Sequence, residues 1–217
     1  MMYTLNQIIV LLLCLVFFNL SYTQNEKDQE NKTTVVIDPG HGGLDSGAIG
    51  VNGVYEKDIV LNIAMEIIRL NNIMENPMEI YLTRYSDTLI SIRNRTELAK
   101  KLKADVLLSI HCNASRNPKA EGAEIYIWDG ESDFSRASIL LAYHLQRVFS
   151  KKIGLKSRGV KFANFQVLRG LYEFCPAVLV ELGFLSHFDE ATFLADKKYS
   201  SYIALVIIEI LWKYFEK

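Results

Sequence analysis

Short apolar runs alternate with longer segments of helical periodicity from residue 33 onward. A short apolar, β-branched run predicts a buried strand, and apolar residues that recur every three or four positions predict a helix. Strands are expected at residues 34–37, 79–83, 106–110, 123–128, 165–168 and 178–180, and helices at residues 58–70, 91–102, 135–149 and 199–214. This alternation predicts a single α/β domain, in which a mostly parallel twisted sheet has helices on both faces.

The first 32 residues do not share this pattern. Ile8 to Leu20 is almost unbroken apolar sequence, shorter than the roughly 20 residues that cross a bilayer. It predicts a signal peptide over residues 1–23, with an uncleaved membrane anchor as the alternative. Residues 24–32 are polar and predict a flexible linker, which leaves residues 33–217 as the folded domain. We therefore expect an exported protein, located in the periplasmic or extracellular space.

Charge and cysteine content limit the partners and the disulfide that the chain can have. Lys and Arg number 24 against 25 Asp and Glu, so no nucleic-acid partner is expected, because phosphate binding usually needs a basic excess. We expect a monomer whose one membrane tether would be the N-terminal apolar segment. Cys112 and Cys175 remain if the leader is removed. They could form a disulfide or stay as small buried side chains.

Polar groups follow three of the expected strands. His41 comes just after the first strand, His111 directly after the strand that ends at Ile110, and Glu181 directly after Val180. Ligands of open α/β sheets bind outside the carboxyl ends of the strands, so these side chains can meet at one edge. A single histidine after a strand is more often structural than a metal ligand. Three such residues at the ends of three strands, however, predict that His41, His111 and Glu181 belong to one functional site.

Glu56 extends this set toward a metal centre. It stands directly before the first helix, where a carboxylate could simply complement the helix N-terminus. Two histidines and one glutamate also form a known catalytic zinc set with an open fourth position, so we predict that His41, Glu56 and His111 bind Zn²⁺. Cys112 is excluded as a ligand because neighbouring strand residues point to opposite faces.

Glu181 is then the candidate general base. A glutamate between apolar residues is costly unless it is paired or lies near a cation. A structural salt bridge is the alternative interpretation of the same pattern.

An ordered series of segments resembles the motifs of the zinc-dependent N-acetylmuramoyl-L-alanine amidases of the type 3 catalytic family. The segments are residues 36–48 (VIDPGHGGLDSGA), 55–58 (YEKD), 81–84 (YLTR), 92–95 (IRNR), 109–114 (SIHCNA), 165–169 (FQVLR) and 176–186 (PAVLVELGFLS). The match begins near Val35 and runs to the C-terminus. The ordered series is specific, whereas no single segment would be.

The resemblance implies a substrate, peptidoglycan, and a cut bond, the amide between N-acetylmuramic acid and L-alanine. It also implies zinc at His41, Glu56 and His111, a catalytic Glu181, and a role in cell-wall remodelling or daughter-cell separation. Two residues depart from the family pattern, His187 and Lys100, where asparagine is common. Residues 129–136 leave little room for the helical insert that covers the site in some members, so an accessible site is expected.

Two alternatives of different kinds stay open. The chain could be a zinc peptidase that cuts another bond of peptidoglycan or of a small peptide. It could also be a non-catalytic cell-wall-binding protein on an amidase-like fold, although a binding protein has no need of a general base.

Overall fold

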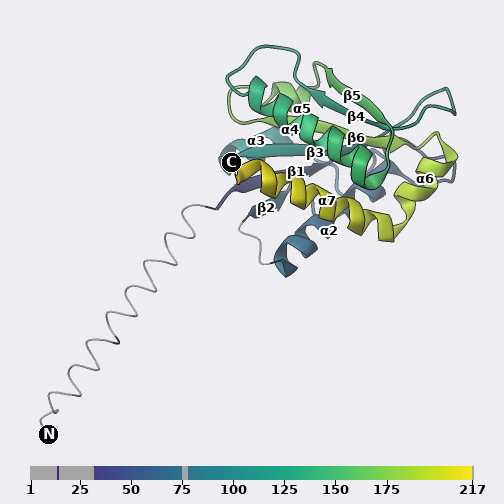
Figure 1. Cartoon of the computed structure of the whole chain (residues 1–217), viewed down its shortest axis with the longest axis horizontal. Coiled ribbons are helices and arrows are strands. Elements are labelled where there is room, and N and C mark those ends of the chain that lie inside the picture. The colour runs from purple at the N-terminus through teal and green to yellow at the C-terminus, as the bar shows by residue number, and fades with distance from the viewer. Residues whose placement is uncertain (1–13, 15–31, 75–77, 217) are drawn as a thin grey trace, which may run out of the picture. The chain divides into compact units, whose positions relative to one another are not determined.

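The computed structural model describes Cys14, residues 32–74 and residues 78–216 (Figure 1). The expected leader (1–23) and linker (24–32) lie outside the described residues except for Cys14 and Lys32, so both remain predictions. Thr33–Lys217 is a compact unit. Within the described part of the chain, no helix has the length and apolarity to cross a membrane.

A six-stranded sheet forms the centre of this unit, in the order β2-β1-β3-β6-β4-β5. The strands are β1 (Thr34–Pro39), β2 (Glu79–Leu82), β3 (Val106–Asn113), β4 (Ala123–Ile127), β5 (Ser157–Phe162) and β6 (Ala177–Phe184). β2, β1, β3 and β6 run parallel, while β4 pairs antiparallel with β6 and parallel with β5. The predicted α/β class with a mostly parallel sheet is confirmed.

Helices cover both faces of the sheet (Figure 1). The larger core lies under α2 (Glu56–Ile73), α4 (Ser135–Val148), α6 (Phe188–Ala195) and α7 (Lys197–Phe215); the π-helix Phe149–Ile153 continues α4. The smaller core lies under α3 (Ile92–Lys101) and α5 (Gln166–Arg169). Val35 faces the larger core and Val36 the smaller one, because successive strand side chains point to opposite faces. Strands buried on both faces therefore have continuous apolar sequences.

One predicted strand is wrong, and two elements were missed. Residues 165–168 belong to the helical turn α5, in which the Arg169 N–H donates to the Phe165 carbonyl at 2.9 Å. Periodicity does not separate a strand from a buried helical turn in so short an apolar run. The missed strand β5 is an edge strand with half-buried and exposed residues, so it lacks an apolar run. The missed helix α6 has only eight residues.

The two cysteines of the folded unit do not pair. Cys112 and Cys175 are both buried free thiols. Cys112 packs in the larger core and Cys175 in the smaller one, so the sheet separates them. The alternative of two small buried side chains is therefore the one that the structure supports.

Candidate metal centre and catalytic carboxylate

The turn after β1 brings His41 to the carboxyl edge of the sheet. His41 has a φ of 57°, a left-handed conformation that is uncommon for a residue other than glycine. A Cβ atom on Gly40 would lie 2.2 Å from Cε1 of His111. Only glycine at position 40 therefore leaves room for the ring of His111 against this turn.

Two buried arginines hold the turn in place. Arg84 donates to the carbonyls of Pro39 and Gly40 at 3.0 and 2.8 Å. Arg95 donates to the carbonyls of Pro39 and His41, both at 2.7 Å. Guanidinium groups suit this task because they present several donors in a rigid plane. In the sequence both arginines are visible only as parts of motifs, and nothing in the pattern there predicts a role for either.

A buried carboxylate, Asp38, balances the charge of Arg95. Its oxygens accept from Arg95 at 2.7 Å, from Thr83 at 2.5 Å and from Ser109 at 2.7 Å. Burial alone would raise the pKa of Asp38, but the charge of Arg95 and these hydrogen bonds hold that pKa below its ordinary value. The support beneath the His41 turn is therefore an ion pair with every carboxylate oxygen satisfied.

Glu56 reaches from the first turn of α2 to both histidines. Its Oε1 lies 3.1 Å from Nε2 of His41 and 3.0 Å from Nδ1 of His111. The backbone N–H groups of Cys112 and Ala48 donate to Oε1 and Oε2 at 2.9 and 2.7 Å. Burial would raise the pKa of Glu56, but the two histidines lower it to about 2. The carboxylate is thus ionised and fixed in position.

These three side chains suit a zinc-sized cation. The ligand atoms of His41, Glu56 and His111 all lie within 4.8 Å of one another. Zinc binds nitrogen and oxygen donors at about 2.0–2.2 Å. Two donors of a tetrahedral zinc site are therefore separated by a distance only slightly longer than the 3.0 and 3.1 Å observed here between Glu56 and the two histidines. The side chains of His41 and His111 remain 25% and 18% exposed, so a small molecule can reach the centre.

Asp45 orients one of the histidines. Its Oδ2 lies 2.8 Å from Nδ1 of His41, which turns Nε2 toward Glu56. Burial would lower the pKa of His41, but Glu56 and Asp45 raise it to about 9. A carboxylate behind a ligating histidine fixes its tautomer and strengthens it as a ligand. The sequence pattern predicts no role for Asp45, and its position four residues after His41 is the one local signal for this contact.

Glu181 lies beside this centre on β6. It is the direct partner of His111 across the β3–β6 pair. Its Oε2 is buried without a hydrogen-bond partner among the described residues. Burial first, and then the charges of Glu56 and Glu124, raise the pKa of Glu181 to about 8. Glu181 forms no salt bridge with any residue that the structure describes, in contrast to the structural alternative.

A cavity of about 720 Å³ opens in front of these groups. His41, His111 and Glu181 line its polar end. Leu89, Ile92, Phe165, Val167 and Leu179 are among the residues of its apolar wall. β4 and α4 are joined by residues 128–134, which contain no helix. As expected from the sequence, no inserted helix follows β4 to cover the site.

Family comparison agrees with this geometry. Residues 35–212 match the family model of N-acetylmuramoyl-L-alanine amidase. The chain belongs to the N-acetylmuramoyl-L-alanine amidase family. The predicted family and the predicted enzyme class, a hydrolase, are thereby confirmed.

Two curated relatives with amidase names resemble the chain over most of its length. LytC of Bacillus subtilis is 38% identical over 176 residues (80% of this chain), but the chain spans only 34% of LytC. AmiA of Escherichia coli is 31% identical over 231 residues, with 87% of this chain and 78% of AmiA covered.

Solved family structures share the fold. The catalytic domain of CwlV from Bacillus (Paenibacillus) polymyxa var. colistinus has 35% identity and a TM-score of 0.76, with 85% of this chain and 98% of that chain covered. The amidase of Clostridium difficile 630 has 34% identity and a TM-score of 0.79, with 86% of this chain and 98% of that one covered.

Proposed function

We propose that this chain is an exported zinc amidase that hydrolyses the amide bond between N-acetylmuramic acid and L-alanine in peptidoglycan. One observation carries the proposal. The ligand atoms of His41, Glu56 and His111 lie close together beside Glu181, whose buried Oε2 has no hydrogen-bond partner among the described residues. Family membership supports the substrate, since the related LytH of Staphylococcus aureus is described as a probable cell wall amidase. Cell-wall remodelling or daughter-cell separation is the proposed cellular role.

Each residue of the site has a task in this reaction. His41, Glu56 and His111 would hold zinc, which when bound polarises a carbonyl and makes water more acidic. Glu181 accepts the proton of the attacking water and passes it to the leaving nitrogen of L-alanine. Its burial next to Glu56 and Glu124 makes it a stronger base than an ordinary glutamate. The open cavity admits the substrate without a movement of an inserted helix.

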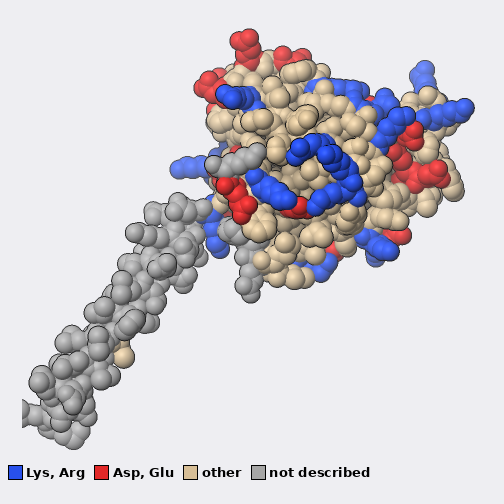
Figure 2. All heavy atoms as spheres, in the orientation of Figure 1, with Lys and Arg blue, Asp and Glu red and all other residues tan. Residues whose placement is uncertain are grey.

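The location and assembly state belong to the same proposal. The apolar N-terminal segment would direct export to the periplasmic or extracellular space, either as a cleaved signal or as an anchor. The balanced charge argues against a nucleic-acid partner, and a monomer is the proposed assembly state. Figure 2 agrees with the charge argument, because acidic and basic side chains are interspersed on the face that it shows.

Mass spectrometry of digested peptidoglycan tests the proposal. Purified protein is incubated with peptidoglycan, with zinc or with a chelator. We expect zinc-dependent release of intact stem peptides that begin with a free L-alanine amine. Cleavage at another bond would favour the zinc peptidase, and retention on peptidoglycan without any product would favour the non-catalytic binding protein.

A further inference from the structure

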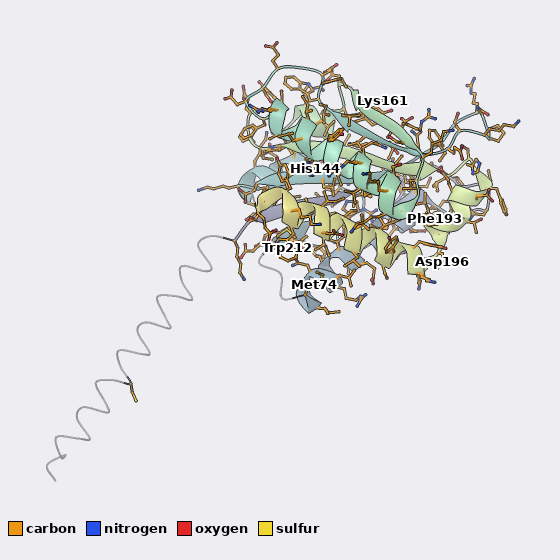
Figure 3. All side chains as sticks on the ribbon, viewed as in Figure 1. Met74, His144, Lys161, Phe193, Asp196 and Trp212 are labelled. Atoms are coloured by element: carbon orange, nitrogen blue, oxygen red, sulfur yellow. The ribbon has the colours of Figure 1, made fainter. Side chains whose placement is uncertain are left out.

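We propose that Arg158 and Lys161 form a subsite that binds a carboxylate of the stem peptide on the leaving side of the cut bond. The inference rests on the proposed function and adds a substrate contact to it. Both residues belong to the edge strand β5, and Lys161 is labelled in Figure 3.

A row of polar side chains leads from the metal centre to these cations. His111 on β3 is opposite Glu181 on β6, and Glu181 is opposite Glu124 on β4. Residues directly opposite each other in a sheet point to the same face. Nε of Arg158 and Nζ of Lys161 both contact Oε1 of Glu124, Lys161 at 2.9 Å. The cationic head groups therefore lie one strand beyond the candidate base.

Charge at this place is unbalanced. Two cations share one carboxylate, Glu124, which is only 3% exposed. The other oxygen of Glu124 accepts from the hydroxyl of Tyr126 at 2.5 Å and from the amide of Asn113 at 3.3 Å. Glu124 is therefore saturated by partners within the fold, and the cluster of Arg158, Lys161 and Glu124 carries one net positive charge.

Donors of the cluster remain free to bind a ligand. Arg158 uses Nε for Glu124 and Nη1 for the backbone carbonyl of Glu121 at 3.4 Å. Its Nη2 has no acceptor within the described residues, and Glu124 is the one acceptor that Lys161 has there. Both cations also lie over aromatic rings, Arg158 over Phe184 at 4.9 Å and Lys161 over Tyr126 at 5.8 Å. The side chains of Arg158 and Lys161 are 36% and 39% exposed. A carboxylate arriving from solvent can thus be bound by both head groups at once.

The spacing selects which carboxylate. Neighbouring strands lie about 4.8 Å apart, and each residue of an extended peptide adds about 3.5 Å. A peptide that leaves Glu181 and crosses β4 toward β5 therefore brings its second residue to the two cations. L-alanine is the first residue after the cut bond, so we assign the carboxylate to the residue that follows it.

A pair of substrates that differ only in this carboxylate tests the subsite. N-acetylmuramoyl-L-alanyl-D-glutamate γ-N-methylamide carries the free α-carboxylate, and the matching D-isoglutamine γ-N-methylamide carries a neutral amide in its place; the γ-carboxyl is blocked in both. We expect the wild-type enzyme to hydrolyse the acid with a kcat/KM about five- to tenfold higher, as one charge-assisted contact at a half-exposed site allows. Equal kcat/KM values for the two substrates would overturn the subsite.

Variants of Lys161 assign the preference to the cluster. Lys161→Met keeps the length of the side chain and should reduce the acid-to-amide ratio at least about threefold, whereas Lys161→Arg should preserve it. Lys156→Met is the matched control, because Lys156 also pairs with a carboxylate, Glu121, at 3.1 Å, but is 65% exposed and does not contact Glu124. A purely structural Lys161 would lower the thermal midpoint and leave the ratio unchanged.

Binding decides the question even if turnover is absent. The dipeptide derivatives L-alanyl-D-glutamate γ-N-methylamide, with a free α-carboxylate, and L-alanyl-D-isoglutamine γ-N-methylamide, without one, are titrated into the protein and followed by NMR. Tighter binding of the acid, with shifts at Lys161, supports the subsite, and equal affinity overturns it. Failure to release stem peptides from whole peptidoglycan would instead overturn the proposed function, so the two failures can be told apart.

Discussion

Glu56 and Glu181 are two carboxylates beside the same cavity, and the fold treats them in opposite ways. Glu56 accepts hydrogen bonds on both oxygens and lies between two histidines, which lower its pKa to about 2. Glu181 accepts no hydrogen bond from any described residue, and its pKa is raised to about 8. A fixed, ionised carboxylate suits a ligand, whereas an unpartnered one suits proton exchange. The difference in surroundings separates the two roles although the residue type is the same.

Exchanging each carboxylate for an amide should separate these roles most sharply. Glu181→Gln should lower turnover of peptidoglycan by about a hundred- to ten-thousandfold, the usual range for the loss of a general base, and should retain zinc. Glu56→Gln should lose zinc as well, because it removes the charged ligand. Product release and zinc content, measured on the same samples, show separately which variant loses catalysis and which loses the metal.

A surface variant supplies the control for this pair. Glu97→Gln removes a partly exposed carboxylate that pairs, within the described residues, with Lys100 alone on the same helix, and it should change neither activity nor metal content. Normal turnover in Glu181→Gln would rule out Glu181 as the base. Normal zinc content in Glu56→Gln would rule out Glu56 as a ligand.

The buried ion pair of Arg95 and Asp38, which supports the turn of His41, should have the next largest effect, on the stability of the fold. Arg95→Met leaves Asp38 buried without its cation and frees the carbonyls that Arg95 holds. Breaking a buried ion pair from one side typically costs about 3–5 kcal/mol. We expect a loss of this order in the free energy of unfolding, measured with denaturant. Arg69→Met is a suitable control, since the ion pair of Arg69 with Glu66 lies at the surface; an equal loss there would contradict the argument.

Glu181 should also make stability depend on pH once zinc has been removed with a chelator. Its pKa is about 8 in the folded chain against 4.5 as the ordinary value. Between these values the folded state binds more protons than the unfolded state, so wild-type stability falls as pH rises. Glu181→Gln has no such proton. Its stability advantage should grow from near zero below pH 4.5 to about 5 kcal/mol above pH 8.

Thermal melts at several pH values measure this difference. Parallel curves for the chelated wild type and Glu181→Gln would show that the carboxylate is not strained in the fold. Zinc should reduce the gap, because a nearby cation stabilises the ionised form.

Asp45 should produce the smallest of these effects. Asp45→Asn keeps the shape of the side chain but removes the charge behind Nδ1 of His41. Loss of such a supporting carboxylate typically weakens metal binding by about 10–100-fold. Competition with a zinc chelator of known affinity measures the change. An unchanged affinity would show that the turn alone orients His41.

Local patterns in the sequence predict the edge of the sheet where the chemistry lies. His111 and Glu181 follow apolar strands directly, and parallel strands present their carboxyl ends at one edge, so their meeting is predictable. Glu124 is not predictable in this way, because its partners come from β5, an edge strand without an apolar run. Arg84 and Arg95 were equally hidden: a buried arginine is explained only by the carbonyls and the carboxylate that it meets in three dimensions. Residues 165–168 could not be assigned from the sequence either. So short an apolar run suits a strand and a helical turn equally well.

The placement of the two cysteines has a consequence for how the domain can be handled and observed. Their thiols lie on opposite sides of the sheet, and a disulfide needs Cα atoms within about 7 Å and facing side chains. Folding therefore requires no oxidising partner, and reductant should leave the fold intact. Burial raises the pKa of both thiols, which keeps them unreactive while the domain is closed. Alkylation at Cys112 would report the opening of the side covered by α2, α4 and α7, and alkylation at Cys175 the opening of the side covered by α3 and α5.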